Sequence, residues 1–326
     1  MTAQSSVRLA ESINATLADL LEHEPRLLLM GLDIGCLGGV FRVTQGLQHR
    51  FGADRVRDSL IAESGIVGQA IGMAMSGLVP VCEMQFAGFA YPAVNQLLSQ
   101  AARMQARWND AIDISMVIRV PSGGGTRGVE HHSDSNEALF SHSPGISVAC
   151  PSTGEDYDEI MRHSVSLGSP VVIYEPIRLY WRRTPPHTGA EPSSSPMSAR
   201  IVRHGADVTV VIYGALTHDV VRAAHELSPE VDVEVVDLRW VAPLDTATIL
   251  ESVARTGRLL IVHEATRRGG IGAEVAAVVA EHGFDTLRCP VRRLAPGEQQ
   301  HPPANREHEY LISLEQIKER ILVMTR

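Results

Sequence analysis

The sequence has few cysteines and no long apolar run, and each shortage excludes a class of protein. Its four cysteines are scattered without a CxxC pair, which argues against a disulfide framework and indicates reduced, mostly buried thiols. The longest apolar stretches, such as residues 27–32, fall far short of the roughly 20 residues that a membrane-spanning helix needs. The N-terminal segment MTAQSSVRLAES lacks an apolar signal core, so we expect a cytoplasmic location.

Net positive charge is also missing. The formal net charge of −9 removes any general attraction to phosphate backbones or anionic membranes, so we expect neither nucleic acid nor a membrane as a partner. Hydrophobic residues make up 44% of the chain and charged residues 21%, which is typical of a globular protein with a real core. A length of 326 residues favours two domains over one.

Helical and strand patterns alternate along the first part of the chain. Leu9, Ile13, Leu17 and Leu20 recur at helical spacing, and the short apolar run RLLLMG follows as a strand. Strands separated by helices, without hairpin signals, predict a parallel α/β sheet with helices on both faces. We expect further helices over about 64–76, 93–108 and 156–166, and strands at VPVCEMQ, ISMVIRV, ISVAC and PVVIYE.

A linker divides the chain. Residues 184–196 (TPPHTGAEPSSSP) are rich in Pro, Ser and Gly and show no apolar periodicity. We therefore expect one domain over residues 1–183, a linker over 184–200 and a smaller α/β domain over 201–326. In the second domain we expect strands at DVTVVIYG, VDVEVVDL and RLLIVHE, with helices near 219–227 and 246–256.

Glu63 stands alone as a charged residue in the stretch IAESGIVGQAIGMAM, at an expected junction between a strand and a helix. Apolar neighbours could desolvate the carboxyl and raise its pKa, so that it could share or donate a proton near neutral pH, as a general acid or a cofactor contact must. The ordinary alternative is a first-turn glutamate that the helix dipole stabilises. These residues alone leave both interpretations open.

The segment VPSGGGTRGVEHHSDS joins a glycine run, 123–125, to the paired histidines His131 and His132 at the end of an expected strand. Strand ends are where parallel α/β sheets bind ligands, and a histidine near its pKa can transfer protons. The alternatives are a flexible loop, surface histidines, or a metal site with Asp134; adjacent ligands on an extended segment face opposite ways, which disfavours the metal. The loop matches neither GxGxxG nor a Walker sequence, so its support for nucleotide binding is weak.

Aromatic residues make up only 5% of the chain, yet Phe86, Phe89 and Tyr91 lie together in MQFAGFAYPAVNQ, just after an expected strand. One of them could stack on a planar cofactor ring, although core packing is the more common role of any single aromatic residue. His263, in IVHEA before the cluster RRGGIGAE, ends an expected strand of the second domain. It is either structural or faces a subunit interface.

Nine ordered segments together resemble the beta subunit of the decarboxylating component of 2-oxo acid dehydrogenase complexes, the pyruvate and branched-chain family. The resemblance spans nearly the whole chain. It implies a transketolase-like α/β fold, with a parallel-sheet pyrimidine-binding domain followed by a smaller C-terminal domain. The segments are GGVFRVTQGL, IAESGIVGQAIGMA, FAGFAYPAVNQ, PSGGGTRG, HHSDSNEALFSHSPG, VACPSTGEDYDE, VVIYEP, VEVVDLRWVAPLD and GRLLIVHEA.

The resemblance also implies cofactors and partners. In this family thiamine diphosphate and Mg²⁺ are bound mainly through an alpha subunit, and this chain has no GDG sequence followed by paired asparagines. We therefore assign it no metal ligand and expect an alpha partner, in an assembly of two alpha and two beta subunits. The implied reaction decarboxylates a 2-oxo acid and passes the acyl unit to a lipoyl group on an acyltransferase core, with the cofactor as electron sink.

Three residues match family positions that have known roles. Glu63 matches the glutamate that hydrogen-bonds the ring nitrogen of the cofactor's aminopyrimidine, and Phe89 matches the aromatic residue that packs against this ring. His132 matches the histidine implicated in reductive acyl transfer to the lipoyl group. His142, in FSHSPG, matches a family position to which we assign no firm role.

Two departures from the family pattern bear on function. The family usually has G-E-D-[VI]-G after the first strand, whereas this chain has GLDIG, so Leu32 stands where a second carboxylate belongs to an acidic network near the cofactor. In SVSLGSP, Leu167 stands among positions that are often acidic or amide residues around a monovalent cation, which argues against an ordinary potassium site.

Two other functions stay open on the sequence. A transketolase-like two-carbon transferase or carboligase in a specialised pathway would keep the cofactor, and Leu32 favours it. A non-catalytic subunit that only docks onto the acyltransferase core is disfavoured by the presence of Glu63, Phe89 and His132. The segments GGVFRVT and GGGTRG look somewhat more like branched-chain or acetoin-type relatives, but they do not define the substrate.

Overall fold

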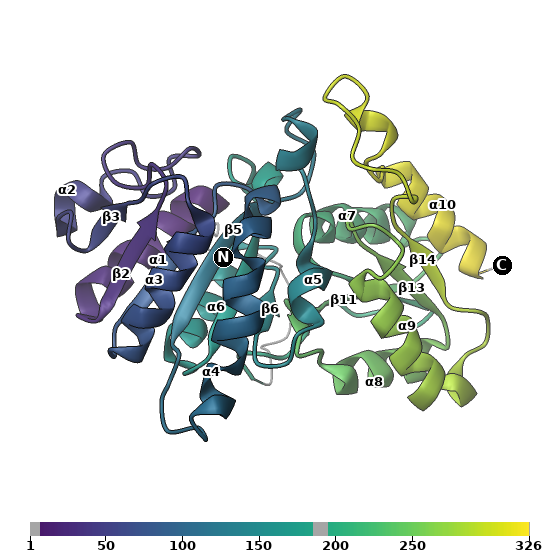
Figure 1. Cartoon of the computed structure of the whole chain (residues 1–326). Coiled ribbons are helices and arrows are strands. Elements are labelled where there is room, and N and C mark those ends of the chain that lie inside the picture. The colour runs from purple at the N-terminus through teal and green to yellow at the C-terminus, as the bar shows by residue number, and fades with distance from the viewer. Residues whose placement is uncertain (1–6, 185–194, 326) are drawn as a thin grey trace, which may run out of the picture.

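The computed structural model describes residues 7–184 and 195–325, which form two α/β lobes (Figure 1). One sheet has seven strands and lies in the first lobe, and a sheet of five strands lies in the second. A short antiparallel pair, β1 (Val7–Arg8) with β8 (Arg183–Thr184), joins the two ends of the first lobe. No helix within the described residues is long and apolar enough to span a membrane.

The first sheet has the strand order β12-β6-β7-β5-β4-β2-β3, and all its neighbouring pairs are parallel except β12 with β6. Its central strands are continuous buried runs, as expected when helices cover both faces of a parallel sheet. The strands are β2 (Leu27–Gly31), β3 (Val56–Asp58), β4 (Val79–Glu83), β5 (Met116–Ser122), β6 (Ser147–Ala149), β7 (Pro170–Pro176) and β12 (Trp240–Ala242).

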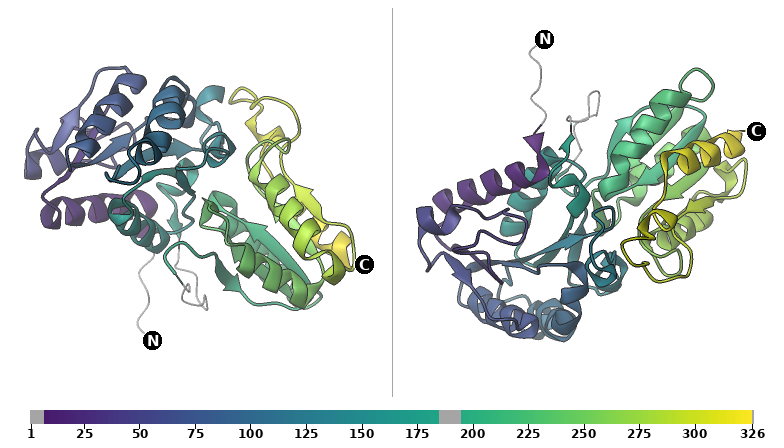
Figure 2. Two further views of the ribbon diagram at one scale, coloured as in Figure 1. Left: turned by 60° about the horizontal axis from the view of Figure 1, so that its bottom comes forward. Right: turned by 90° about the horizontal axis from the view of Figure 1, so that it is seen from above.

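Helices cover both faces of this sheet (Figure 2). On one face α1 (Leu9–His23) packs against α6 (Gly154–Ser166), which begins where the Thr153 hydroxyl accepts a hydrogen bond from the backbone N–H of Asp156 at 3.1 Å. The other face carries α3 (Glu63–Met75), the 3-10 segment η1 (Ala87–Ala93), the π-helical η2 (Asn95–Ala101) and α4 (Ala102–Arg107). Smaller elements are α2 (Leu47–Phe51), η3 (Glu130–His132), α5 (Glu137–Ser141) and η4 (Ile177–Leu179).

The second sheet has the order β14-β13-β10-β11-β9, and only the edge strand β9 is antiparallel to its neighbour. On one face α7 packs with α10, and α8 and α9 lie on the other. The strands are β9 (Arg200–Arg203), β10 (Val208–Ile212), β11 (Val233–Asp237), β13 (Leu259–Val262) and β14 (Arg292–Leu294). The helices are η5 (Gly214–Leu216), α7 (Thr217–Leu227), α8 (Thr246–Thr256), α9 (Ile271–His282), η6 (Phe284–Thr286), η7 (Glu307–Glu309) and α10 (Leu314–Thr325).

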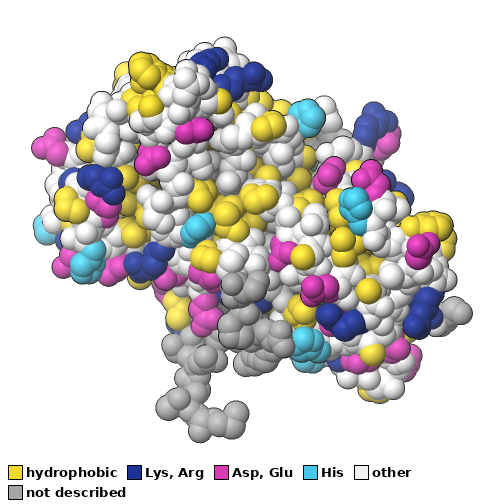
Figure 3. Space-filling model, turned by 90° about the horizontal axis from the view of Figure 1, so that it is seen from below, with side chains coloured by type: hydrophobic (Ala, Val, Ile, Leu, Met, Phe, Trp, Pro, Cys, Tyr) yellow, Lys and Arg dark blue, Asp and Glu magenta, His cyan; other side chains and the backbone are white. Residues whose placement is uncertain are grey.

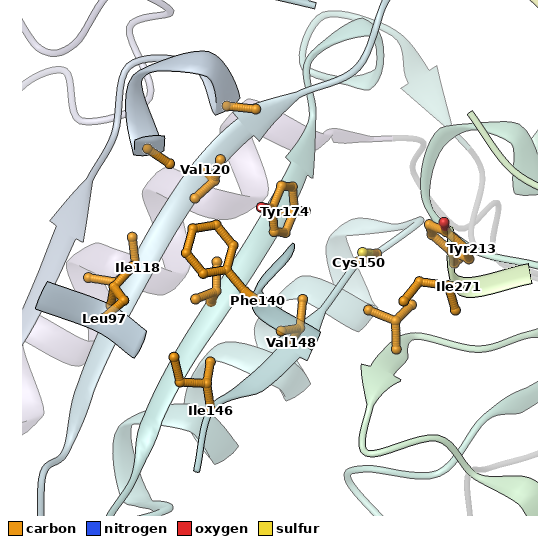
Figure 4. Close-up of a cluster of buried hydrophobic side chains, with 14 of the residues drawn as sticks. Leu97, Ile118, Val120, Phe140, Ile146, Val148, Cys150, Tyr174, Tyr213 and Ile271 are labelled. Carbon is orange, nitrogen blue, oxygen red and sulfur yellow. The ribbon is translucent and has the colours of Figure 1, made fainter. Parts of the chain in front are cut away.

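One hydrophobic core runs through both lobes. Figure 4 shows Phe140 and Tyr174 of the first lobe in the same cluster as Tyr213 and Ile271 of the second. The strand β12 comes from the second part of the chain but completes the edge of the first sheet, where the Trp240 side chain is fully buried. Seen from below, hydrophobic side chains gather near the middle of the molecule, and Lys and Arg side chains lie mostly towards its edges (Figure 3).

The sequence patterns gave most elements but missed several features. The expected all-parallel sheets are in fact mixed, because β12 and β9 each add an antiparallel edge strand. The helix expected over 93–108 is three segments, a 3-10 turn that contains Pro92, a π-helical stretch and then α4. Most of the linker expected over 184–200 lies outside the described residues; Thr184 belongs to β8 and Arg200 to β9.

Candidate active site

The three residues singled out from the sequence all follow the carboxyl ends of strands in the first sheet. Glu63 comes after β3, Phe89 after β4 and His132 after β5, and these strands run parallel through β2. Carboxyl ends of parallel strands meet at one edge of a sheet, where open α/β folds bind their ligands. The structure therefore places these residues at the same edge, and η1 packs against both α3 and η3.

Phe89 and His132 belong to one aromatic cluster. The Phe86 and His132 rings stack with centroids 3.8 Å apart and planes at 12°, and Phe89 lies edge-on to His132 at 5.2 Å. Gly88 is required between the two segments, because a Cβ there would lie 2.2 Å from the carbonyl oxygen of His131. Since one face of Phe86 is covered by His132, Phe89 is the better placed of the two phenylalanines to meet a ligand.

His132 is held in its neutral form. Partial burial and the nearby His131 lower its pKa below the ordinary value of 6.5, although Glu130 opposes this shift. A neutral imidazole carries one N–H donor and one acceptor nitrogen, so it can donate a hydrogen bond through one nitrogen and accept a proton at the other near pH 7. The two adjacent histidines lie in a 3-10 turn with ring centroids 4.4 Å apart, and the expectation of an extended segment there was wrong.

Glu63 is the first residue of α3 and is half-buried. Among the described residues no side chain or backbone group hydrogen-bonds its carboxylate. The preceding Leu60 and Ile61 are 85% and 78% exposed, so this chain alone does not supply the apolar surroundings that the sequence suggested. Large exposed apolar side chains beside an unpaired carboxylate mark a surface that binds a partner.

A buried charge network that the sequence patterns did not predict lies behind this edge. The Arg119 guanidinium donates to Glu175 at 2.7 and 2.9 Å, to Glu83 at 2.6 Å and to the Tyr157 hydroxyl at 3.1 Å, and Tyr180 also donates to Glu175. Burial raises the pKa of Glu83, and the Arg119 charge only partly offsets this. A signal was present, because three adjacent apolar strands, VIRV, VCE and VIYE, each contain a single charged residue.

Leu32 follows β2 directly and is half-buried near this network. The next residue, Asp33, adopts a left-handed conformation with φ of 59° and accepts a hydrogen bond from Gln85 at 3.3 Å. A Cβ on Gly39 would lie 3.4 Å from the Glu83 carboxylate, so that carboxylate reaches the turn after β2. Glu83 is therefore the buried acid next to the position where Leu32 replaces a family carboxylate.

A cavity of about 560 Å³ lies between the lobes, next to the histidines. Tyr91 donates to Asp134 at 3.2 Å on its wall, and burial raises the pKa of that carboxyl although Tyr91 opposes the shift. Its lining is mostly polar and comes from both lobes, with Tyr91, His131, Asp134 and Asn136 on one side and Glu264, Thr266, His301 and Tyr310 on the other.

Comparison with known proteins shows what this arrangement belongs to. Residues 5–181 match the family model described as Transketolase, pyrimidine binding domain, and residues 197–317 match Transketolase, C-terminal domain. The pyruvate dehydrogenase E1 component subunit beta of Leifsonia xyli is 43% identical over 96% of this chain and 93% of its own length. The chain belongs to the beta subunits of 2-oxo acid dehydrogenases.

Other relatives of this beta subunit are named for branched-chain substrates. The 3-methyl-2-oxobutanoate dehydrogenase subunit beta of Mycobacterium tuberculosis is 41% identical over 94% of this chain and 88% of its own length. The 2-oxoisovalerate dehydrogenase subunit beta of Bacillus subtilis is 40% identical over 87% and 88%. In fold alone, a split gene transketolase described as an inactive beta4 tetramer has a TM-score of 0.76 at 21% identity, over 98% of this chain and all of that one. The expected transketolase-type α/β fold is confirmed.

Three further residues noted in the sequence, His263, His142 and Leu167, follow other elements of the beta subunit: β13, α5 and α6. His263 is fully buried, its Nδ1 lies 2.9 Å from the carbonyl oxygen of Ala265, and burial lowers its pKa to about 4, which favours the structural role. His142 ends α5 and lines a groove with the cis-peptide segment at Pro243. Next to Leu167, the Gln105 amide donates to the carbonyl oxygen of Gly168 at 2.7 Å. No group of three or more His, Cys, Asp or Glu in the described part of the chain could hold a metal ion.

Proposed function

We propose that this beta subunit, together with an alpha subunit, thiamine diphosphate and Mg²⁺, decarboxylates a 2-oxo acid and transfers the acyl unit to a lipoyl group. One observation carries the proposal: Glu63, Phe89 and His132 follow the carboxyl ends of three strands in one parallel sheet. The lipoyl group would belong to an acyltransferase core, and the assembly would contain two alpha and two beta subunits. Residues 1–183 and 201–326 would act as its pyrimidine-binding and C-terminal domains.

Glu63 would hold the aminopyrimidine end of the cofactor. Its carboxylate has no hydrogen-bond partner among the described residues and stands beside the exposed Leu60 and Ile61. An alpha subunit that covers these side chains would remove water from the carboxylate and strengthen its hydrogen bond to a ring nitrogen. The half-buried ring of Phe89 would pack against the pyrimidine.

The diphosphate and the metal do not fit this chain. The glycine-rich loop at 123–128 resembles a phosphate cradle, but its Gly125 and Arg127 amides already donate to the Glu307 carboxylate. The described residues also offer no metal-binding cluster. An alpha partner would therefore supply these contacts. When bound, the cofactor supplies the electron sink for decarboxylation.

His132 would act in the acyl transfer. Reduction of the lipoyl disulfide leaves a sulfur that carries negative charge. The N–H group of His132 could donate a hydrogen bond to this sulfur, or a proton when the imidazole is in its protonated form. Phe86 stacks on the imidazole and limits the orientations of the ring. This assigns Glu63 and Phe89 to cofactor binding and His132 to the later step.

The test is Glu63→Gln, with Glu155→Gln as a matched control, because Glu155 is an exposed first-turn acid of α6. The chain is assembled with its alpha partner, thiamine diphosphate and Mg²⁺, and CO₂ release and reduction of an artificial electron acceptor are measured. Loss of proton sharing should lower turnover by about 10²–10⁴-fold in Glu63→Gln and leave the control unchanged. Unchanged turnover in Glu63→Gln would contradict the assignment.

The substrate panel for this assay follows from the relatives, which are named for two acids: pyruvate, and the branched-chain acid called 3-methyl-2-oxobutanoate or 2-oxoisovalerate. Turnover with one of these acids would identify the acyl group. Leu32 keeps a two-carbon transferase as the second candidate, since it removes a carboxylate beside the buried Glu83. Consumption of a ketose phosphate without CO₂ release would favour that candidate.

A further inference from the structure

The glycine run at 123–125 is required by the close approach of the second lobe. A Cβ on Gly123 would lie 2.9 Å from the Glu264 carboxylate, and one on Gly124 would lie 2.8 Å from Nε2 of His301. Both distances are shorter than real Cβ contacts, so a side chain at either position would force side chains of the second lobe to shift. The loop therefore lies directly between the two lobes.

Glu307 joins this loop to the second lobe. The residue lies in η7 and is 3% exposed, and its carboxylate accepts the backbone N–H of Gly125 at 2.8 Å and that of Arg127 at 3.0 Å. Positive φ angles of 95° at Gly125 and 56° at Arg127 turn these amides towards one point. Converging backbone N–H groups form an anion site, and the carboxylate occupies it.

The loop that Glu307 binds, residues 123–128, leads directly into the turn η3, which contains His131 and His132. It connects β5 to η3, and only Gly128 and Val129 separate Arg127 from the turn that contains His132. Figures 1 and 2 show the segment after β14, in yellow, beside the teal segment between β5 and α5. The position of the His132 ring thus depends on its stacking with Phe86 and on the loop that Glu307 binds.

We propose that Glu307 is a positioning residue for acyl transfer to the lipoyl group, and that it acts by fixing the loop that orients His132. The inference rests on the role proposed above for His132. The Glu307 carboxylate accepts from the Gly125 and Arg127 amides and lies 3.7 Å from Nε2 of His301, so its effect on His132 passes through the backbone of residues 125–132. Glu307 in the second lobe would thereby influence acyl transfer at His132, which lies at the strand ends of the first lobe.

The first experiment tests whether Glu307 holds the loop at residues 123–128. Glu307→Gln and the matched control Glu309→Gln remove the same charge from η7, but Glu309 is exposed and pairs with Arg306 at the surface. Amide hydrogen exchange over residues 122–134 is followed in each assembled complex with the alpha subunit. Loss of a charge-assisted hydrogen bond should speed exchange of the loop amides by about tenfold or more in Glu307→Gln, and not in the control. Equal exchange rates in both variants would show that Glu307 does not hold the loop.

The second experiment separates positioning from general structural support. Decarboxylation is measured with an artificial electron acceptor, and acyl transfer with a lipoylated domain, on the same complexes. Glu307→Gln should slow acyl transfer by about tenfold and decarboxylation by a smaller factor, and Glu307→Asp, which restores a carboxylate, should recover part of the transfer rate. Equal losses in both assays would overturn the positioning role.

A double variant identifies the route of the effect. In a His132→Gln background, Glu307→Gln should cause no further loss of acyl transfer, because residues that act through one group are not additive. Independent, additive losses would overturn the inference. If His132→Gln alone leaves acyl transfer unchanged, the role of His132 falls and the positioning role falls with it, while hydrogen exchange still decides whether Glu307 holds the loop.

Discussion

Replacement of Arg119 by methionine should strongly destabilise the first lobe. Arg119 is 1% exposed and makes hydrogen bonds to Glu83, Glu175 and Tyr157. Methionine fills much of the same space but carries no donor, so two buried carboxylates lose their counter-ion. The folded state must then keep unpaired buried charges or protonate the carboxyls, and both choices cost free energy.

The size of the effect follows from the burial of the network. Breaking a buried ion pair by removal of one partner costs about 3–5 kcal/mol of unfolding free energy. For a domain of about 150–250 residues, each kcal/mol lowers Tm by about 2–4 °C, which gives a decrease of about 6–20 °C. The exposed Arg162 also pairs with two carboxylates, Asp19 and Asp158, and serves as the control because solvent screens its ion pairs.

The effect of Arg119→Met should also depend on pH. Burial already raises the pKa of Glu83, and removal of the Arg119 charge raises it further. A carboxyl whose pKa is higher in the folded than in the unfolded state contributes most to stability below the unfolded pKa of about 4.5, where it is protonated in both states. This contribution to the free energy of unfolding is lost as pH rises towards the folded pKa. The difference in Tm between the variant and the wild type should therefore be larger at pH 8 than at pH 5.5.

The assay is thermal unfolding of the purified proteins, followed by circular dichroism at both pH values. Arg119→Met should lose far more thermal stability than Arg162→Met, and its loss should grow with pH. A decrease of less than about 2 °C in Arg119→Met, or the same decrease in both variants, would refute the reasoning from burial.

Two other substitutions test the contact between the lobes. Burial and the charge of Asp156 raise the pKa of Asp237 to about 7, so ionisation of this carboxyl destabilises the folded state increasingly as pH rises from about 4 to 7. The Tm of Asp237→Asn should therefore rise relative to that of the wild type over this window. Parallel pH profiles of the two Tm values would contradict this. Gly124→Ala should lower the unfolding free energy by about 1–3 kcal/mol, because its methyl group meets His301 and Leu311 within 2.8 and 2.9 Å. Gly72→Ala, which meets no atom within 4 Å, is the control, and equal Tm values for the two alanine variants would count against the steric argument.

Periodicity was a good guide to single elements. The spacing of Leu9, Ile13 and Leu17 gave α1, and the helix expected over 246–256 is α8 with the same bounds. Each of these elements buries a face that its own sequence defines. Pairing between strands is different, because β12 joins a sheet whose other strands lie more than 60 residues earlier in the chain. No local pattern in residues 240–242 encodes that partner or its antiparallel direction.

The candidate site was predictable in part. Local composition singled out Glu63, the aromatic run that contains Phe89 and the histidine pair that contains His132, and only the family resemblance selected Phe89 and His132. All three residues follow strands of one sheet. The Arg119 network carried a signal, a charge inside an apolar strand, that was not recognised. Glu307 carried none, since it lies in an ordinary polar segment 180 and 182 residues after the two amides that it binds.

The sequence by itself determined the alternation of the central strands with most of the longer helices, the α/β class and, through its ordered motifs, the family. These properties depend on short-range periodicity and on residue types that chemistry restricts. Only the tertiary structure decided that a carboxylate fills the glycine loop, that His132 stacks on Phe86, and that one core joins both lobes. Such contacts join residues distant in the chain, and their energy depends on burial and geometry that exist only after folding.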